Sequence, residues 1–269
     1  MAKKPSPDQL NLFDDWFIVN EPVGKPQDIP TVSSDSVLPE EGNTVTETFE
    51  KSRHVLSLRL AEALDKDGEI TSKTLTEEAN RAFGGTQAEG AYSSKDSYDA
   101  MEAAFNIHLS RTESVDWNNQ GGAWARNKAE ELTRRIQTLP TQTRRDEEMD
   151  EFQQFSTPPA LSFVANWVAN VKASDEMMDP SAGTGDLAIW AKISGAKVIL
   201  NELSQRRIDL LGDLFPDARL FKENAEQLDN VLPIDAIPSV IVMNPPFSST
   251  AGRVQGQRDT SNGDRKSVV

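Results

Sequence analysis

Short apolar segments alternate with helical patterns between residues 176 and 243, and this alternation constrains the fold more than any other feature. The apolar segments are Glu176–Asp179, Lys197–Leu200, Ala218–Phe221 and Ser239–Met243. The stretches between them have helical patterns, and these patterns end at Gly195, Leu214 and Leu232. Strands that alternate with helices predict a parallel sheet covered by helices on both faces. We therefore expect an α/β fold over residues 151–247.

The region before this alternation, residues 47–150, has a helical pattern instead. Leu56, Leu60 and Leu64 recur at the spacing of one helical face. Turn-forming residues such as Asp67-Gly68 and Gly84-Gly85 separate such stretches. We expect a small helical domain with helices over Phe49–Leu64, Leu75–Phe83, Ser97–Leu109 and Trp124–Leu139.

The two ends of the chain are polar. Residues 1–50 hold 3 basic and 10 acidic side chains, and the first 46 are rich in Pro and Ser. Such a composition predicts a disordered acidic tail over residues 1–46. Residues 248–269 form a second polar tail. The net charge of −15 is unusual for a nucleic-acid-binding protein, because phosphate contacts favour Lys and Arg.

Composition also excludes several classes of protein. The chain has no cysteine and two histidines, so we expect neither disulfides nor a metal site. No apolar run approaches the ~20 residues that cross a bilayer, and no apolar segment follows the basic residues at the start. We expect a soluble, cytoplasmic protein without a membrane partner.

A glycine-rich turn follows the first predicted strand: Asp179-Pro180-Ser181-Ala182-Gly183-Thr184-Gly185. Glycines let the backbone approach a ligand, and the N-terminus of the next helix attracts negative charge. The turn has no lysine for a phosphate loop, so a nucleotide-like cofactor suits it better. Glu202 ends the next strand, where its carboxylate can accept both hydroxyls of a ribose. The alternative is that Glu202 is simply a solvated strand end.

A second motif, Asn244-Pro245-Pro246-Phe247, directly follows the last apolar segment. The two prolines fix the turn and remove two donors, which leaves carbonyl oxygens facing outward as acceptors. The Asn244 amide oxygen adds an acceptor, and Phe247 offers a face on which a base can stack. Acceptors that hold both hydrogens of a planar amine localise its nitrogen lone pair and prepare it for methyl transfer.

These two motifs resemble those of the class I S-adenosylmethionine-dependent methyltransferases, in the order that the amino-methyltransferases have them. Upstream, Gln154–Pro159 resembles the Phe-x-Thr-Pro element of adenine-N6 DNA methyltransferases. The resemblance implies S-adenosylmethionine as the cofactor and a catalytic turn of Asn244, Pro245, Pro246 and Phe247. It implies cofactor contacts from Phe155, Thr157, Pro158, Asp179, Pro180, Ala182, Gly183, Thr184, Gly185, Glu202 and Asn224, the last beside the adenine of the cofactor.

The upstream element also begins a helix. We expect Thr157 at its N-cap and Pro158 at its first position, as both residues favour. The alternative is a plain helix start without a role in binding. The apolar residues at helical spacing predict the buried face of this helix as Leu161, Val164, Trp167, Val168 and Val171.

The resemblance further implies a seven-stranded Rossmann-like sheet in the order 3-2-1-4-5-7-6. The chain ends about 25 residues after the fourth apolar segment, so we expect an incomplete sheet with Val240–Val242 at its edge. An exposed edge strand pairs readily with other chains. We expect self-association there, or a protein that supplies the missing strands. More loosely, the stretch Gly84–Gly90 resembles the front of mobile-element proteins in which such a methyltransferase precedes a strawberry-notch-type helicase.

The favoured function is methyl transfer to the N6 amine of adenine in DNA, which requires flipping of the base out of the duplex. Methyl transfer to cytosine N4 is a close variant. Methyl transfer to cytosine C5 is excluded, because it needs a cysteine nucleophile and the chain has none. Methyl transfer to RNA or to protein glutamine is the second possibility, since those enzymes share the Asn-Pro-Pro motif but usually lack the Thr-Pro element. The third is a non-catalytic cofactor-binding module.

Overall fold

A computed structural model describes residues 41–117, 120–140 and 157–245, with side chains from Thr48 onward. These residues belong to one compact unit. The polar C-terminal tail, and the predicted acidic tail up to residue 40, lie outside the described residues. Helix α1 (Glu41–Asp67) begins inside the segment predicted as tail. No helix in the described ranges is both long and apolar enough to span a membrane.

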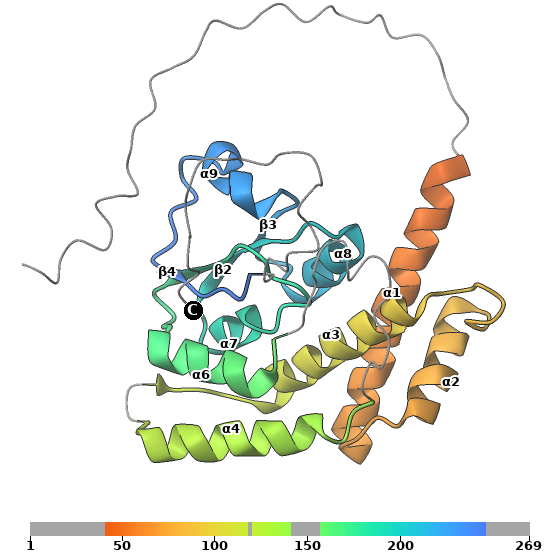
Figure 1. Cartoon of the computed structure of the whole chain (residues 1–269), viewed down its shortest axis with the longest axis horizontal. Helices are drawn as coiled ribbons and strands as arrows, with labels where there is room; N and C mark the ends of the chain where they lie inside the picture. The colour runs from red at the N-terminus through yellow and green to blue at the C-terminus, as the bar shows by residue number, and fades with distance from the viewer. Residues whose placement is uncertain (1–40, 118–119, 141–156, 246–269) are drawn as a thin grey trace, which may run out of the picture. The chain divides into compact units, whose positions relative to one another are not determined.

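The expected parallel sheet is present. It consists of β1 (Glu176–Asp179), β2 (Lys197–Asn201), β3 (Arg219–Phe221) and β4 (Val240–Ile241), in the order β3-β2-β1-β4 (Figure 1). All three pairings are parallel. The chain therefore has an α/β, Rossmann-like fold, and its strand order is that of the first four strands implied by the resemblance. Strand β4 is shorter than the predicted segment Ser239–Met243.

The two faces of the sheet are covered unequally. Met177, Val198 and Leu200 point into a large core together with α7 (Ala188–Ile193) and most other helices. Met178 and Ile199 point to the opposite face, where they pack on Leu228 and Ala236 in a small cluster. This split follows from the alternation of side chains along a strand. The prediction of helices on both faces is confirmed, but within the described residues the second face has only the short η4 (Ala225–Gln227) and α9 (Leu228–Val231).

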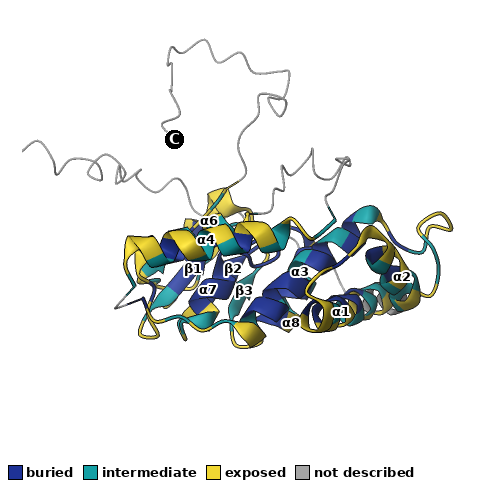
Figure 2. Cartoon of the chain, turned by 90° about the horizontal axis from the view of Figure 1, so that it is seen from below, coloured by how far each residue is buried: buried dark blue, intermediate teal, exposed yellow. Residues whose placement is uncertain are grey.

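The N-terminal helices pack directly on the strand region. Helices α1 and α3 (Ser94–Thr112) contact each other and both contact α8 (Gln205–Leu214), while α3 also reaches α7. One continuous apolar core runs through both parts. Helix α3 is accordingly buried along most of its length (Figure 2). The remaining two helices are α2 (Ser72–Phe83) and α4 (Gly122–Ile136). All four predicted helices are confirmed, each begins earlier than predicted, and α4 ends before the predicted Leu139.

Local capping explains where these helices begin and end. The Thr71 side chain accepts a hydrogen bond from the backbone of Thr74 and starts α2. Ser93 and Asp96 form a reciprocal capping box at the start of α3. Gly68 and Gly84 follow α1 and α2 with positive φ angles of 72° and 69°, a conformation that glycine adopts without strain. The predicted breaks at both glycines are confirmed.

Two predictions about helix α6 (Pro159–Ala169) need correction. The predicted start is wrong, and the predicted buried face is right only for Val171, which is buried, and for Val164 and Trp167, which pack against the core. Pro158 is the N-cap residue and Pro159 occupies the first turn, so the helix starts one residue later than expected. Its outer face carries Leu161 and Val168, which are 62% and 70% exposed. The buried face consists of Pro159, Ser162, Phe163 and Asn166.

Hydrogen bonds explain why polar residues of α6 face inward. The Asn166 side chain donates to the carbonyl oxygen of Leu187, and Trp190 donates its indole N–H to the Ser162 hydroxyl. These contacts satisfy buried polar groups on α6 and next to α7. A hydrophobicity pattern cannot reveal such partners, so it predicted Leu161 and Val168 as buried in place of Ser162 and Asn166.

Candidate functional site

The glycine-rich turn and Glu202 lie side by side at the carboxyl edge of the sheet. Strands β1 and β2 pair in parallel with Asp179 opposite Leu200, so both chains leave the sheet at the same level. The Ala182 N–H donates to the Asn201 carbonyl oxygen over 2.8 Å. The Asn201 side chain also donates to the carbonyl oxygens of Pro180 and Glu223, each over 2.9 Å. Asn201 thus fixes the turn against the ends of β2 and β3.

Glu202 is buried and hydrogen-bonded to the turn, so it is not a solvated strand end. Its Oε2 accepts a hydrogen bond from the Gly183 backbone N–H over 2.9 Å, and its Oε1 accepts one from Ser204 N–H over 2.8 Å. Each carboxylate oxygen has capacity for a second hydrogen bond. Glu202 therefore holds Gly183 in place and still offers acceptors to a ligand.

The two glycines of the turn do different things. Gly183 has a φ of +59°, and a Cβ atom there would lie 3.6 Å from the Arg207 guanidinium, which is an ordinary contact. Glycine is therefore favoured at this position because of the positive φ angle and not because of a steric clash. Gly185 has a φ of +94°, and a Cβ atom there would lie 2.6 Å from the ring of Phe215. Gly185 is needed for the close packing of the turn against α8.

The other residues of the turn differ in exposure. Pro180, Ser181 and Gly183 are half-buried, so the accessible surface of the turn lies there. Ala182 and Thr184 are buried. The Thr184 hydroxyl donates to Glu102 of α3 over 3.0 Å, so this side chain faces the protein interior.

Buried carboxyl groups surround the turn. Burial raises the pKa of Asp179 to about 7, and the neighbouring charges of Glu202 and Asp186 raise it further, against a hydrogen bond from Ser181 N–H. Burial also raises the pKa of Asp186 to about 6, although Asn106, Arg207 and Thr184 favour its charged form. Carboxyl groups with raised pKa values in one place are typical of sites that bind or react.

Residues from the two outer motifs meet beside this turn. The Asn244 amide nitrogen donates to the Thr157 hydroxyl over 3.0 Å, although 87 positions separate them. The backbone N–H of Thr157 in turn donates to the Asp186 carboxylate. Pro245 is exposed at the end of the described residues. The predicted site residues Phe155, Pro246 and Phe247 lie outside the described residues.

Asn224, predicted beside the cofactor adenine, lies at the start of η4. Its side-chain oxygen accepts a hydrogen bond from Glu226 N–H over 3.1 Å and caps the short helix. The side chain is exposed just beyond β3. A carbonyl-type oxygen has two lone pairs, so Asn224 can cap the helix and accept from a ligand.

A cavity of about 260 Å³ opens next to Thr157 and Asp186. Its walls come from α3, from the end of α4 and from the start of α6. Apolar side chains form most of them, and the polar groups are Tyr98, Glu102, Thr157 and Asp186. An apolar cavity with a few convergent polar groups is the usual form of a small-molecule site.

Helix α3 is the part of the site that sequence reasoning missed. The Asn106 amide nitrogen donates to the Thr184 carbonyl oxygen over 3.1 Å and to the Asp186 carboxylate over 2.9 Å. Glu102 accepts from Thr184. Asp186 could have been noticed directly after Gly185, but no local signal connects α3 with a turn some 80 residues away.

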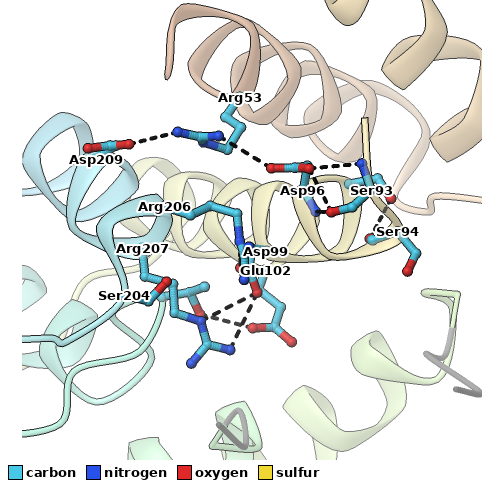
Figure 3. Close-up of polar contacts among 12 residues, drawn as sticks. Arg53, Ser93, Ser94, Asp96, Asp99, Glu102, Ser204, Arg206, Arg207 and Asp209 are labelled. Atoms are coloured by element: carbon cyan, nitrogen blue, oxygen red, sulfur yellow. Dashed lines mark hydrogen bonds and ion pairs between the residues drawn. The ribbon is translucent and has the colours of Figure 1, made fainter. Parts of the chain in front are cut away.

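Buried ion pairs connect α3 with α8 (Figure 3). Asp99 of α3 pairs with Arg206 over 2.6 Å and with Arg207 over 3.4 Å. Arg53 of α1 bridges Asp96 and Asp209. Burial disfavours the charged form of Asp99, but Arg207 and Arg206 outweigh burial and hold its pKa below the ordinary value. Arg207, next to Gly183, thus has a fixed position.

Comparisons with known proteins give one weak structural likeness. No protein-family model matches the chain, and no curated protein shows significant similarity. A crystal structure of a protein from Listeria monocytogenes, provisionally assigned as a class I S-adenosylmethionine-dependent methyltransferase, matches with a TM-score of 0.31 and 16% identity. The match covers 75% of this chain and 59% of that one. A likeness this weak carries no functional argument, so the function has to be inferred from the site itself.

Proposed function

We propose that this chain binds S-adenosylmethionine and transfers its methyl group to the N6 amine of adenine in DNA. The observation that carries the proposal is the contact between Asn244 and Thr157 beside the glycine-rich turn. Three segments with methyltransferase-like motifs, which are far apart in the sequence, come together at one edge of a parallel sheet. Ligands of open α/β sheets bind at this carboxyl edge.

The charges of the site fit this cofactor. S-adenosylmethionine supplies a reactive methyl group on a positively charged sulfur, and its amino-acid end carries an ammonium group. Asp179 and Asp186 are buried, and their raised pKa values reflect insufficient compensation for a negative charge. A bound cation would provide it. Glu202 has free acceptor capacity for ribose hydroxyls, and Glu102 and Asp186 in the cavity beside Thr157 would face the ammonium group.

Asn244 would act on the target amine. Its Oδ1 and the Pro245 carbonyl oxygen would accept the two hydrogens of the amine, and Phe247 would stack on the base. Such acceptors stabilise the developing positive charge on nitrogen in the transition state. The target adenine must leave the duplex to reach this edge. The Thr-Pro element favours DNA adenine over RNA or protein glutamine.

The test is a methyl-transfer assay with radiolabelled cofactor on DNA, RNA and protein in parallel, with the Asn244→Ala variant as comparison. We expect label in adenine of DNA, and a loss of about 10²–10³ in rate for the variant. Calorimetric titration should show little change in cofactor affinity, because Asn244 acts on the amine.

Other results would redirect the proposal. Label in RNA or in protein would show that the substrate is RNA or protein and not DNA. Cofactor binding without any methyl transfer would identify a non-catalytic module. Absence of cofactor binding would refute the proposal as a whole.

Partners follow from the same proposal. DNA is the expected macromolecular substrate. Strand β4 lies at the edge of the described sheet and Ile241 is 58% exposed there, which supports association with a second copy or with a protein that adds strands. A helicase partner is supported only by the sequence resemblance of Gly84–Gly90.

A further inference from the structure

A chain of hydrogen bonds runs from helix α3 to the proposed catalytic amide. Asn106 donates to Asp186 over 2.9 Å, Asp186 accepts from the backbone of Thr157, and Thr157 accepts from Asn244 over 3.0 Å. We propose that Thr157 is a positioning residue that orients the Asn244 amide, and that α3 holds Thr157 in place through Asp186. This inference rests on the proposed methyl transfer.

The orientation of the amide decides whether Asn244 can act. A carboxamide has one oxygen that accepts hydrogen bonds and one nitrogen that only donates. If the amide turned over, its N–H groups would face the hydrogens of the target amine and repel them. Because Thr157 accepts from Nδ2, the amide oxygen is left for the substrate. In the structure, the hydroxyl of Thr157 holds the amide in this productive orientation.

The position of Thr157 is itself restricted. It precedes Pro158, and Asn244 precedes Pro245, so steric clashes with the proline rings confine both backbones to extended conformations. The branched Cβ of Thr157 limits its side-chain rotamers. Its backbone N–H donates to Asp186, a buried carboxylate that also accepts from Asn106. Thr157 thus presents its hydroxyl from a fixed point.

The first experiment compares two substitutions that differ in the hydroxyl. Thr157→Val keeps the shape and removes the acceptor, whereas Thr157→Ser keeps the acceptor. We expect kcat for methyl transfer to fall about 10- to 100-fold in the Val variant, with a smaller change in the cofactor Kd, and to recover in the Ser variant. A raised Kd with unchanged kcat would make Thr157 a cofactor contact only and overturn the proposal. Failure of Ser to restore kcat would overturn it too.

A second measurement does not need turnover. The side-chain amide signals of Asn244, assigned by their loss in Asn244→Asp, are followed by heteronuclear NMR. We expect Thr157→Val and Asn106→Ala to shift them and Thr157→Ser to leave them near their original positions. The exposed amide of Asn230 is the internal control. Unchanged Asn244 signals in Thr157→Val would refute the positioning role, whereas a wild-type protein that binds no cofactor would refute the proposed function alone.

Discussion

Individual carboxyl groups determine the charge of the candidate site. Asp179 and Asp186 are buried next to the glycine-rich turn, and burial raises their pKa values to about 7 and about 6. Glu202 and Glu102 add negative charge nearby, and Arg207 is the cation that faces them. Asp99 already pairs with Arg207, so this arginine only partly compensates the carboxylates of the turn. In the cofactor-free protein, Asp179 therefore stays protonated up to a pH well above the pH range in which an ordinary aspartate ionises.

We predict that cofactor affinity rises with pH. The ionised form of Asp179 binds a cation, and the competent fraction of a group with a pKa near 7 grows about tenfold between about pH 6 and about pH 8. Titration calorimetry in buffers of different ionisation enthalpy should show this gain together with proton release. Asp179→Asn keeps the hydrogen bond to Ser181 N–H and should remove the part of the pH dependence near pH 7, leaving the part from Asp186 near pH 6. Tight binding at low pH with no proton release would contradict the prediction.

The same pKa shifts act on stability with the opposite sign. A raised pKa means that the folded state binds protons more tightly than the unfolded chain. The stabilisation from Asp179 is fully present below the ordinary aspartate pKa of 3.8 and is lost as pH rises through about 7. In the cofactor-free protein, these two groups therefore oppose folding at neutral and alkaline pH. Bound cofactor should stabilise the protein most in that range.

At the scale of elements, helix α3 connects the N-terminal helices with the site. It packs on α1, α7 and α8, and its polar residues Glu102 and Asn106 face the turn. Asp99 anchors Arg206 and Arg207, while Glu102 and Asn106 hold Thr184 and Asp186. The helix is thus part of the wall of the site as well as part of the core.

We predict that Asp99→Ala destabilises the protein strongly. Removal of one partner of a buried ion pair leaves the other charge uncompensated and costs about 3–5 kcal/mol. Denaturant unfolding should show this loss. Arg219 and Asp235 form an exposed pair, so Asp235→Ala is the matched control and should cost less than about 1 kcal/mol. Equal effects of the two substitutions would show that the α3–α8 pairs contribute no more than a surface pair.

At the scale of the molecule, the described residues cover the sheet mainly on one face, and β4 is its edge strand among them. Ile241 and Met243 are 58% and 57% exposed, and Ile234 and Ile237 in the preceding segment are also exposed. Val242, between Ile241 and Met243 in the sequence, is buried. An apolar edge strand favours pairing with a further strand.

We predict concentration-dependent self-association through this edge. Light scattering coupled to size exclusion should show it, and Ile241→Lys should weaken it because a charge on an edge strand opposes pairing. Val168→Lys is the control, since Val168 is also exposed but lies on α6. If the wild-type protein is monomeric at all concentrations, or if both variants behave alike, β4 is not the association surface.

The sequence by itself determined the local features of this protein. The alternation of strands and helices, the turn glycines and the helix breaks at Gly68 and Gly84 depend on residues close together in the chain, and all were predicted. Only the tertiary structure decided which face α6 buries, that Phe215 covers Gly185, and that Asn106 supports Asp186. These features depend on partners from distant segments, which become neighbours only when the whole core packs. Hydrophobic period and turn propensity act over a few residues, so they carry no information about such contacts.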